Sequence, residues 1–502
     1  MILIPMGKKC LKIALSGVFV LSISLSALGQ GAGDVLRFGL QYPSQDAVGV
    51  VMPGVTNATG FGAYQENPAS MALFDESFFS FSLSNRYVNE EGTYLGNTSS
   101  FDDNNASVGD IGFVYNVPTA RGKLTVGGGY SQTHDFNRAF SGSARNNLST
   151  LTDKYAALSL NDPLNTAAFN AFAIDDVQGE DRSLSILRFP VGSDYAGINQ
   201  NFETTEQGTL GEYSAFLATE VLKNFIVGAS IGVISGTYTY ERDFLEIDSE
   251  NDYDGEFIDS DGDGTFDSDI NTIRSEDTIN QTFTGFSARL GVIYQPTSFI
   301  NIGAGYQFKN TITVDEEFDT FITTTLDNGD FFEGDDLGEI RYDIIRPSRF
   351  NAGLTLNNLS GLTFSASTER VDYSEGRIEF DELEFEQVEN DENRIVESNL
   401  EDVYNYRFGL EYQVNEQFTP RIGYGYYPSP TGDFENQELD GDRRFYSAGF
   451  TAQISENTKL NLGGQLGIWD DRNTVYSTPD VSESITENVN HWNIFAGLTF
   501  QF

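Results

Sequence analysis

Four arginines in this chain have the chemistry to hold the carboxylate of an amphiphilic ligand. Each stands in a stretch where apolar and polar residues alternate, at a position on the polar side. A desolvated guanidinium binds a carboxylate through two parallel hydrogen bonds, and positive charge is scarce among 75 acidic and 29 basic residues. The candidates are Arg289, Arg349, Arg407 and Arg421, with Ile234, Ile293 and Phe495 as apolar contacts for the ligand tail. The alternative is a structural network with acids such as Glu369 and Glu411.

An acidic segment further along the chain predicts a weak calcium site. Asp259, Asp261, Asp263 and Asp267, with a glycine at the sixth place, match the first nine places of a calcium loop. Ile270 replaces the glutamate of the twelfth place, so a complete EF-hand is absent. We expect Ca²⁺ to bind in this loop outside the cell and no other cofactor to be required. The alternative is an acidic, solvated loop.

Composition argues against an enzyme and against a nucleic-acid partner. The chain has two histidines, His134 and His491, and no cluster of histidine and cysteine that would bind a metal. No serine is specifically matched to His134, and His491 is expected to face inward, away from a lipid substrate. The formal net charge of −46 leaves no basic patch for nucleic acid.

The segment His491–Phe502 indicates which elements hold these side chains. Its apolar residues alternate with polar ones, and side chains in a strand point to opposite faces with a period of two. A strand with one apolar and one polar face, ending the chain on phenylalanine, is typical of a barrel in lipid. Abundant tyrosine, phenylalanine and glycine fit the same class.

The same alternation recurs along the chain and predicts about 14 strands, an even number as a single-chain bacterial barrel requires. Each is near or above the roughly 9–11 residues that cross a membrane when tilted. The predicted strands are Phe78–Tyr87, Ser107–Asn116, Leu124–Phe136, Gly211–Val221, Phe225–Tyr240, Thr282–Tyr294, Phe299–Phe308, Arg346–Leu356, Leu362–Tyr373, Val403–Val414, Phe418–Tyr427, Arg444–Ile454, Lys459–Trp469 and Asn488–Phe502.

Connections between these strands alternate between tight turns and long segments. Short periplasmic turns and long extracellular loops produce this pattern, so we expect an all-β, transmembrane antiparallel β-barrel in the bacterial cell outer membrane, with lipid around it. The longest connection, Asn137–Leu210, contains an Asp-Pro helix start at Asp162 and one apolar helical face. It is either a cover that packs on other loops or a landing site for a hydrophobic ligand.

The first 29 residues are expected to be a signal peptide. Lys8, Lys9 and Lys12 precede an apolar stretch that ends in small residues suited to cleavage before Gln30. The only cysteine, Cys10, would leave with this segment. After residue 29 no apolar run approaches the roughly 20 residues of a membrane helix.

Residues 34–81 resemble a known family. Asn67, Pro68 and Ala69 stand just before the first predicted strand, after nearly 50 residues without membrane alternation. This order is similar to the long-chain fatty-acid transporter family of outer-membrane barrels (the FadL, OMPP1 and TodX type), particularly its Bacteroidetes forms. The glycine-rich run that usually precedes the motif is thinned here to Gly49, Gly54, Gly60 and Gly62.

The resemblance implies a domain organisation and a transport route. Residues 30–76 would form an N-terminal plug, with Asn67-Pro68-Ala69 as its motif, and residues 77–502 the barrel. Family members import hydrophobic small molecules, fatty acids among them, by passive diffusion: ligand enters through extracellular loops and leaves sideways through the wall. The gap arises at a kink in the third strand, where this chain has Gly127, Gly128 and Gly129, although these glycines could equally make room for the plug. We expect a monomer.

Two other functions remain open at this point. A barrel of this type could capture a protein partner with its long acidic loops, as a related fourteen-stranded secretion shuttle does. A purely structural outer-membrane role is the third possibility. Lipid that co-purifies with the protein would favour transport over both.

Overall fold

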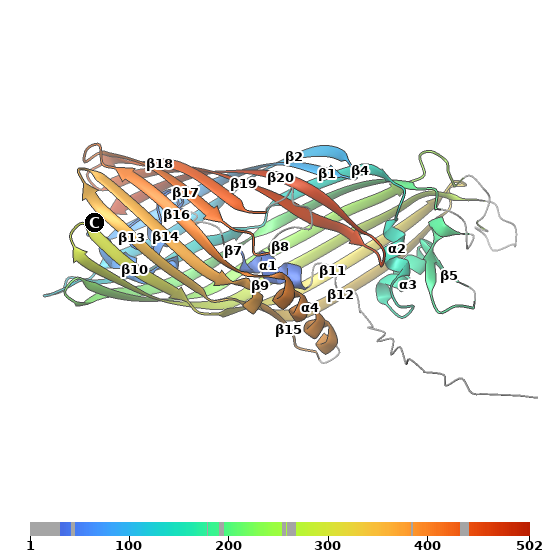
Figure 1. Cartoon of the computed structure of the whole chain (residues 1–502), viewed down its shortest axis with the longest axis horizontal. Helices are drawn as coiled ribbons and strands as arrows, with labels where there is room; N and C mark the ends of the chain where they lie inside the picture. The colour runs from blue at the N-terminus through green and yellow to red at the C-terminus, as the bar shows by residue number, and fades with distance from the viewer. Residues whose placement is uncertain are drawn as a thin grey trace, which may run out of the picture.

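The wall of the protein is one closed antiparallel β-sheet. The computed structural model describes residues 31–41, 46–177, 179–189, 195–253, 258, 268–382, 385–431 and 441–502. In these residues eighteen segments form the sheet, and four of its strands are each interrupted once, which leaves the predicted fourteen (Figure 1). The first strand closes on the last, from Phe78 opposite Gln501 to Tyr94 opposite Ile485. The predicted all-β, fourteen-stranded barrel is therefore confirmed.

Uninterrupted wall strands pair in chain order, as the alternation predicts. They are β1 (Phe78–Tyr94), β2 (Asn97–Asn116), β7 (Ile198–Leu222), β8 (Phe225–Ile247), β9 (Ile270–Thr297), β16 (Asp402–Tyr412), β17 (Phe418–Tyr427), β18 (Arg443–Ser455), β19 (Thr458–Ser477) and β20 (Ser482–Gln501). Interrupted ones are β3 (Leu124–Asp135) with β4 (Arg138–Asn146), β10 (Ile300–Gln307) with β11 (Asn310–Leu326), β12 (Phe331–Arg346) with β13 (Arg349–Leu359), and β14 (Leu362–Asp372) with β15 (Arg377–Phe380).

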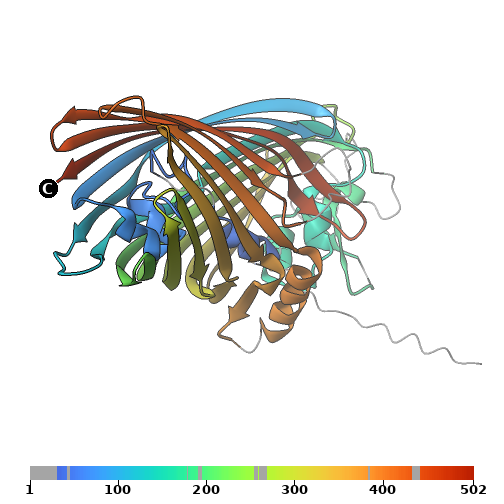
Figure 2. The ribbon, with the colours of Figure 1, turned by 60° about the vertical axis from the view of Figure 1, so that its left-hand side comes forward.

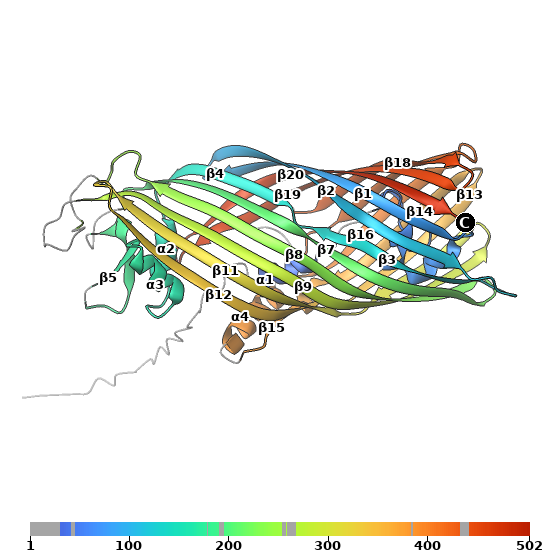
Figure 3. The same cartoon turned by 180° about the vertical axis from the view of Figure 1, so that it is seen from behind.

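Several strands extend far beyond a membrane. β9 has 28 residues, which at about 3.3 Å per residue is roughly 90 Å, against a hydrocarbon core of about 30 Å. Much of four predicted loops (89–106, 241–281, 309–345 and 470–487) is therefore strand. Alternation missed these parts because a strand that faces water on its outer side no longer needs an apolar face. Figures 1 and 3 show the long strands reaching the end of the barrel opposite the C-terminus.

The first described residues, 31–41 and 46–74, lie inside the barrel. Helix α1 (Ala32–Gly39) lies between the walls, and the short helices η2 (Phe61–Gln65) and η3 (Pro68–Leu73) lie nearer the C-terminal end (Figures 1 and 2). Met52, Tyr64 and Met71 in this segment are fully buried, since wall side chains surround them. No helix in the described residues is long and apolar enough to cross a membrane.

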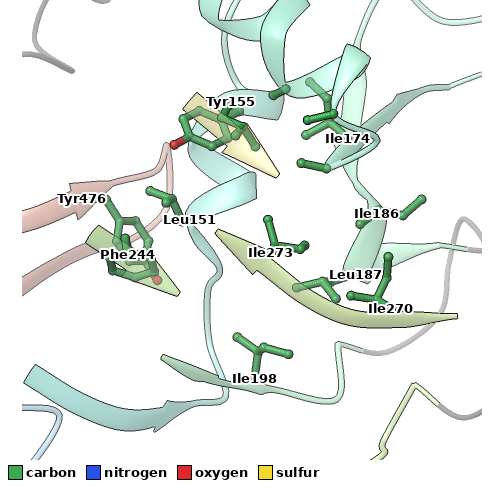
Figure 4. Close-up of a cluster of buried hydrophobic side chains, with 14 of the residues drawn as sticks. Leu151, Tyr155, Ile174, Ile186, Leu187, Ile198, Phe244, Ile270, Ile273 and Tyr476 are labelled. Carbon is green, nitrogen blue, oxygen red and sulfur yellow. The ribbon is translucent and has the colours of Figure 1, made fainter. Parts of the chain in front are cut away.

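Both ends of the predicted loop 137–210 are wall strand, in β4 and β7, and its middle folds into a small cap at the outer end of the barrel. It contains α2 (Leu151–Ala156), α3 (Pro163–Asn170), β5 (Ile174–Asp176), β6 (Ser183–Ser185) and the short helix η4 (Ile186–Arg188). Asp162 begins α3 as predicted, accepting a hydrogen bond from Leu164 N at 3.0 Å. Apolar cap residues pack on strand residues such as Phe244 and Ile273 (Figure 4). The helical face is thus used for packing, which agrees with a cover.

A second helical insertion was not predicted from the sequence. After β14, a short helix η5 (Tyr373–Glu375), β15 and α4 (Glu386–Asn399) stand beside the wall (Figure 2). Val396 of α4 is buried, and Glu392 accepts a hydrogen bond of 2.9 Å from the backbone N–H of Ala32. This insertion therefore contacts the start of α1.

Candidate functional site

The Asn67-Pro68-Ala69 motif anchors the N-terminal segment to the wall. Asn67 Nδ2 donates to the carbonyl of Val55 at 2.7 Å and to that of Val292 on β9 at 3.2 Å. Its Oδ1 accepts from Ala69 N at 3.0 Å, which caps η3, and Pro68 occupies the first turn of that helix. One side chain thus joins two parts of the segment to the barrel.

A row of wall glycines receives this motif. Gly228 on β8 is opposite Gly291 on β9, which is opposite Gly305 on β10. A Cβ atom on Gly228 would overlap the backbone of Ala69, and one on Gly291 would overlap Asn67 Oδ1. This row was not predicted from the sequence. Its signal is three glycines at inward positions of neighbouring strands, which leaves the wall bare where another backbone approaches.

Arg289 is held in a buried ion pair. Its two terminal nitrogens donate to Glu212 of β7 at 2.7 and 2.9 Å, and its Nε donates to Gln307 at 3.0 Å. The arginine is 3% exposed and Glu212 is 1% exposed. Its carboxylate-binding edge is therefore occupied by the protein's own acid, as in the structural network considered above.

Arg349 and Arg407 connect the wall to the N-terminal segment. Arg349 donates to Glu369 at 2.8 Å and to the carbonyl of Gly39 at the end of α1. Arg407 donates to Glu66 at 2.6 Å and to the carbonyl of Gly49. Both residues thus satisfy backbone carbonyls in the segment, which is a structural role.

Arg421 lies apart from the other three and faces a cavity near the C-terminal end of the barrel. Its Nε donates to Glu411 at 2.6 Å and its Nη1 donates to Thr451 at 2.7 Å. The structure therefore does not gather the four arginines into one pocket.

The three predicted tail contacts belong to three different clusters. Ile234 packs with Phe38 of α1, and Ile293 packs with Phe61 and Met71. Phe495 is fully buried against Ala47, Val50 and Val51. All three residues do face inward, as alternation predicted. They contact the N-terminal segment, so they do not line one shared ligand cavity.

The third strand is interrupted, but after its glycines. Gly127, Gly128 and Gly129 lie in unbroken ladders with both β2 and β7. A Cβ atom on Gly129 would overlap the backbone of Ile111 and Gly112 on β2 and then the ring of Phe61, so this glycine leaves room for both the neighbouring strand and the N-terminal segment. The interruption between β3 and β4 comes at residues 136–137, more than six residues further on.

The wall loses its backbone pairing next to this interruption. The ladder between β2 and β3 ends where Asp110 is opposite Ser131. In the described residues no ladder joins the rest of β2 to β4, although both strands remain paired on their other edges. Side chains bridge the two edges instead: Ser107 donates to Gln132 at 2.7 Å and Asn97 donates to the carbonyl of Ser143 at 2.9 Å. We call the facing edges without a ladder, which are residues 97–109 of β2 on one side and residues 132–146 of β3 and β4 on the other, the side seam.

An aromatic cluster covers the inner side of the side seam. Phe136 meets Phe38 of α1 edge-on at 5.6 Å between ring centroids, and Phe38 meets Phe283 of β9 at 4.7 Å. Arg86 of β1 donates to the carbonyl and the carboxylate of Asp135, the residue before Phe136, at 2.7 and 2.9 Å. Helix α1 therefore contacts the wall at the point where the third strand breaks.

The position of α1 is fixed by buried polar contacts. Asp34 accepts a hydrogen bond from Tyr342 at 2.6 Å and pairs with Arg37 at 2.8 Å. Burial raises the pKa of Asp34, while the charge of Arg37 acts in the opposite direction. Arg37 also lies over the ring of Tyr238 at 4.6 Å. These contacts hold Phe38 against the side seam.

The predicted calcium ligands Asp259, Asp261, Asp263 and Asp267 lie outside the described residues. Within the described part of the chain, no group of three or more histidine, cysteine and acidic side chains is arranged to hold a metal ion. The two histidines pack on aromatic rings. The ring centroids of His134 and Phe136 are 4.5 Å apart, and those of His491 and Trp469 are 5.7 Å apart.

Comparison with known proteins agrees with the geometry. Residues 203–494 match the family described as outer membrane protein transport protein (OMPP1/FadL/TodX). The fold is similar to the crystal structure of a Pseudomonas aeruginosa FadL homologue, with a TM-score of 0.54 and 12% identity over 92% of this chain and 100% of that chain.

Two toluene transporters align over similar lengths. They are TodX of P. putida (14% identity, TM-score 0.49, 91% of this chain and 98% of that chain) and TbuX of Ralstonia pickettii (16% identity, TM-score 0.49, 92% and 99%). No curated protein matches the sequence significantly. The family match covers more than half of the chain, so this protein belongs to the OMPP1/FadL/TodX family of bacterial outer-membrane transport proteins for hydrophobic compounds.

Proposed function

We propose that the protein carries long-chain fatty acids or similar amphiphiles passively through the outer membrane. Cargo enters at the extracellular end and leaves sideways through the side seam. The observation that carries this proposal is the end of the β2–β3 ladder at Asp110 and Ser131. In this proposal residues 30–76 act as the plug and residues 77–502 as the barrel, which works as a monomer because the seam must face lipid.

The height of the side seam supports an exit into the membrane. From Thr125, close to a short periplasmic turn, to Ser131 the part of β3 that pairs with β2 has seven residues. At about 3.3 Å per residue and a tilt of about 45°, it rises roughly 16 Å along the membrane normal. The hydrocarbon core is about 30 Å thick, so pairing stops inside it.

Unpaired backbone at this depth is otherwise costly. Lipid offers no hydrogen bonds, so irregular backbone is tolerated only where protein buries it or where it lines a water-filled cavity. Ser107 and Gln132 hydrogen-bond to each other beside the end of the ladder, and at the outer end of the seam Asn97 and Ser99 donate to the backbone carbonyls of Ser143 and Ser141. A polar-edged gap of this kind suits an amphiphile that passes with its acid near the edge and its tail toward lipid.

Uptake of labelled oleate by cells that lack their own importer tests the function. We expect uptake well above the empty-vector level when the protein is present and folded in the outer membrane. Folded protein with uptake at the vector level would contradict the proposal. Vesicles that contain the purified barrel and a fatty-acid reporter inside give the same answer without cellular metabolism.

The variant Phe38→Ala should increase uptake. An edge-on aromatic pair contributes about 0.5–1.5 kcal/mol, and its loss frees Phe136 to move away from the lumen. If about 1 kcal/mol holds the seam closed, the open population rises about fivefold. Initial oleate uptake rates at equal surface expression measure the effect.

The control for this variant is Phe286→Ala, which removes a ring from the outer face of β9. Phe286 is 74% exposed and belongs to no aromatic pair in the described residues, so its loss should leave the rate unchanged. An uptake rate for Phe38→Ala at or below the wild-type rate would show that α1 does not close the exit.

A further inference from the structure

A cavity of about 430 Å³ lies between the N-terminal segment and the wall near the C-terminal end of the barrel. Its wall side is formed by β17–β20, β1 and β2, and its other side by residues 46–48, 58–61 and 73–76. This volume falls in the range of ligand pockets. It is separated along the barrel from the aromatic cluster at the side seam.

The wall side of this cavity offers hydrogen-bond donors without a partner. In the described residues the ammonium group of Lys459 has no ion pair or hydrogen bond, and neither does the Nη2 atom of Arg421. A relay links the two positions. Arg421 donates to Thr451, Thr451 donates to Asn461 at 2.7 Å, and Asn461 donates to Thr499 at 3.0 Å. Thr499 is opposite Lys459 in the ladder of β19 and β20.

Four acids line the same cavity, and the two buried ones are engaged by the chain, whereas Asp75, which pairs with Lys123 at 3.0 Å, and Glu76 are exposed to solvent. Asp46 accepts from the backbone N–H groups of Val48 and Gly49 at 2.9 and 2.7 Å. Asp110 accepts from the hydroxyl groups of Ser80 and Ser82. The buried acceptors of the cavity are therefore satisfied, while the ammonium group of Lys459 and the Nη2 atom of Arg421, an arginine already paired with Glu411, remain as donors that would orient an anionic group.

Apolar side chains complete the lining. Leu73, Phe74 and Phe78 line the cavity, and the rings of Phe74 and Phe78 meet at 4.8 Å. Gly497 of β20 has no side chain to fill this part of the cavity. A Cβ atom added there would lie 3.4 Å from its nearest neighbour, Ser82 Cβ, which is an ordinary van der Waals distance, so a larger residue has room to enter. A chain of carbons can thus extend from the cationic side along aromatic edges.

We propose that this cavity binds an anionic headgroup on an apolar chain, with the headgroup at Lys459 and Arg421. The inference rests on the proposed function, because a fatty acid is the cargo that carries this chemistry. An anionic lipid of the periplasmic leaflet carries the same chemistry. The cavity would be an additional ligand-binding site, between the N-terminal segment and the wall and away from the side seam.

Calorimetric binding of palmitate and of hexadecanol to the purified full-length barrel tests the site. The alcohol has the same chain without the charge. Lys459→Gln should weaken palmitate binding about tenfold and leave hexadecanol unchanged, and Lys459→Arg should restore palmitate binding. Lys223→Gln, in an exposed turn away from the cavity, is the matched control and should bind both as wild type does. Gly497→Leu fills the cavity and should weaken both ligands.

Phosphatidylglycerol in the same titration separates the two sources of the headgroup. Binding of this lipid that also depends on Lys459 would support the site with a membrane lipid as occupant. If Lys459→Gln and Gly497→Leu both bind palmitate like wild type while wild type still imports oleate, the cavity is not the site and the transport proposal stands. If wild type neither binds palmitate nor imports oleate, both proposals fail.

Discussion

Gly291→Val should release the N-terminal segment from the barrel and make the outer membrane leaky. Any Cβ atom on Gly291 overlaps Asn67 Oδ1, so the motif and the wall cannot keep their positions together. Asn67 would lose three side-chain hydrogen bonds, at roughly 0.5–1.5 kcal/mol each, which together amount to about 2–4 kcal/mol. Sensitivity of expressing cells to a large hydrophilic antibiotic measures the leak, and the gel shift of unheated protein reports whether the barrel has folded.

Two further variants make this result specific. Gly464→Val places the same side chain on β19, where a Cβ atom would meet nothing closer than 3.9 Å, and it should leave permeability unchanged. Asn67→Ala removes the same hydrogen bonds but leaves every wall residue unchanged, and cells that express it should be as leaky as cells with Gly291→Val. This second variant keeps the test valid if Gly291→Val fails to fold. Normal permeability in a folded Asn67→Ala barrel would rule out the anchoring role.

Arg289→Met should destabilise the barrel by about 3–5 kcal/mol. The substitution leaves Glu212 buried beside an apolar side chain, and an isolated buried carboxylate is far more costly than a buried pair. Gln307 also loses the guanidinium as its partner. Urea unfolding of the detergent-solubilised barrel, followed by intrinsic fluorescence, measures the change.

The double variant Arg289→Met with Glu212→Leu decides between a structural and a ligand-binding role. Removing both charges should recover most of the lost stability, because no unpaired charge remains. A cargo-binding arginine would behave differently: uptake would need a higher oleate concentration in both variants while the unfolding midpoint stayed near wild type. That outcome would show that Arg289 binds the cargo.

The membrane-spanning strands could be predicted because their signal is local. A strand between lipid and lumen must alternate along its own length, and this alternation placed Arg289, Arg407 and Phe495 on the inward face, where the structure has them buried. Outside the membrane the outer face may be polar, so the alternation disappears. The outer parts of β9 and β11 were therefore read as loop although their ladders continue.

The partner of an inward side chain cannot be read in the same way. Arg407 pairs with Glu66, 341 residues earlier in the chain, and Arg289 pairs with Glu212 two wall strands away. The sequence is compatible with both ligand binding and a structural network for these arginines. Only the closed barrel, with the N-terminal segment inside it, shows that their carboxylate-binding edges are occupied.

From the sequence alone follow the barrel, its fourteen strands, the inward and outward faces and the motif Asn67-Pro68-Ala69, because each depends on neighbouring residues. Tertiary structure decided the rest: the glycine row that receives the motif, the end of the β2–β3 ladder beside Phe136, and the cavity beside Lys459. The physical reason is that these features arise where segments distant in the chain meet across a closed sheet. Alternation within one strand carries no information about which residue stands opposite.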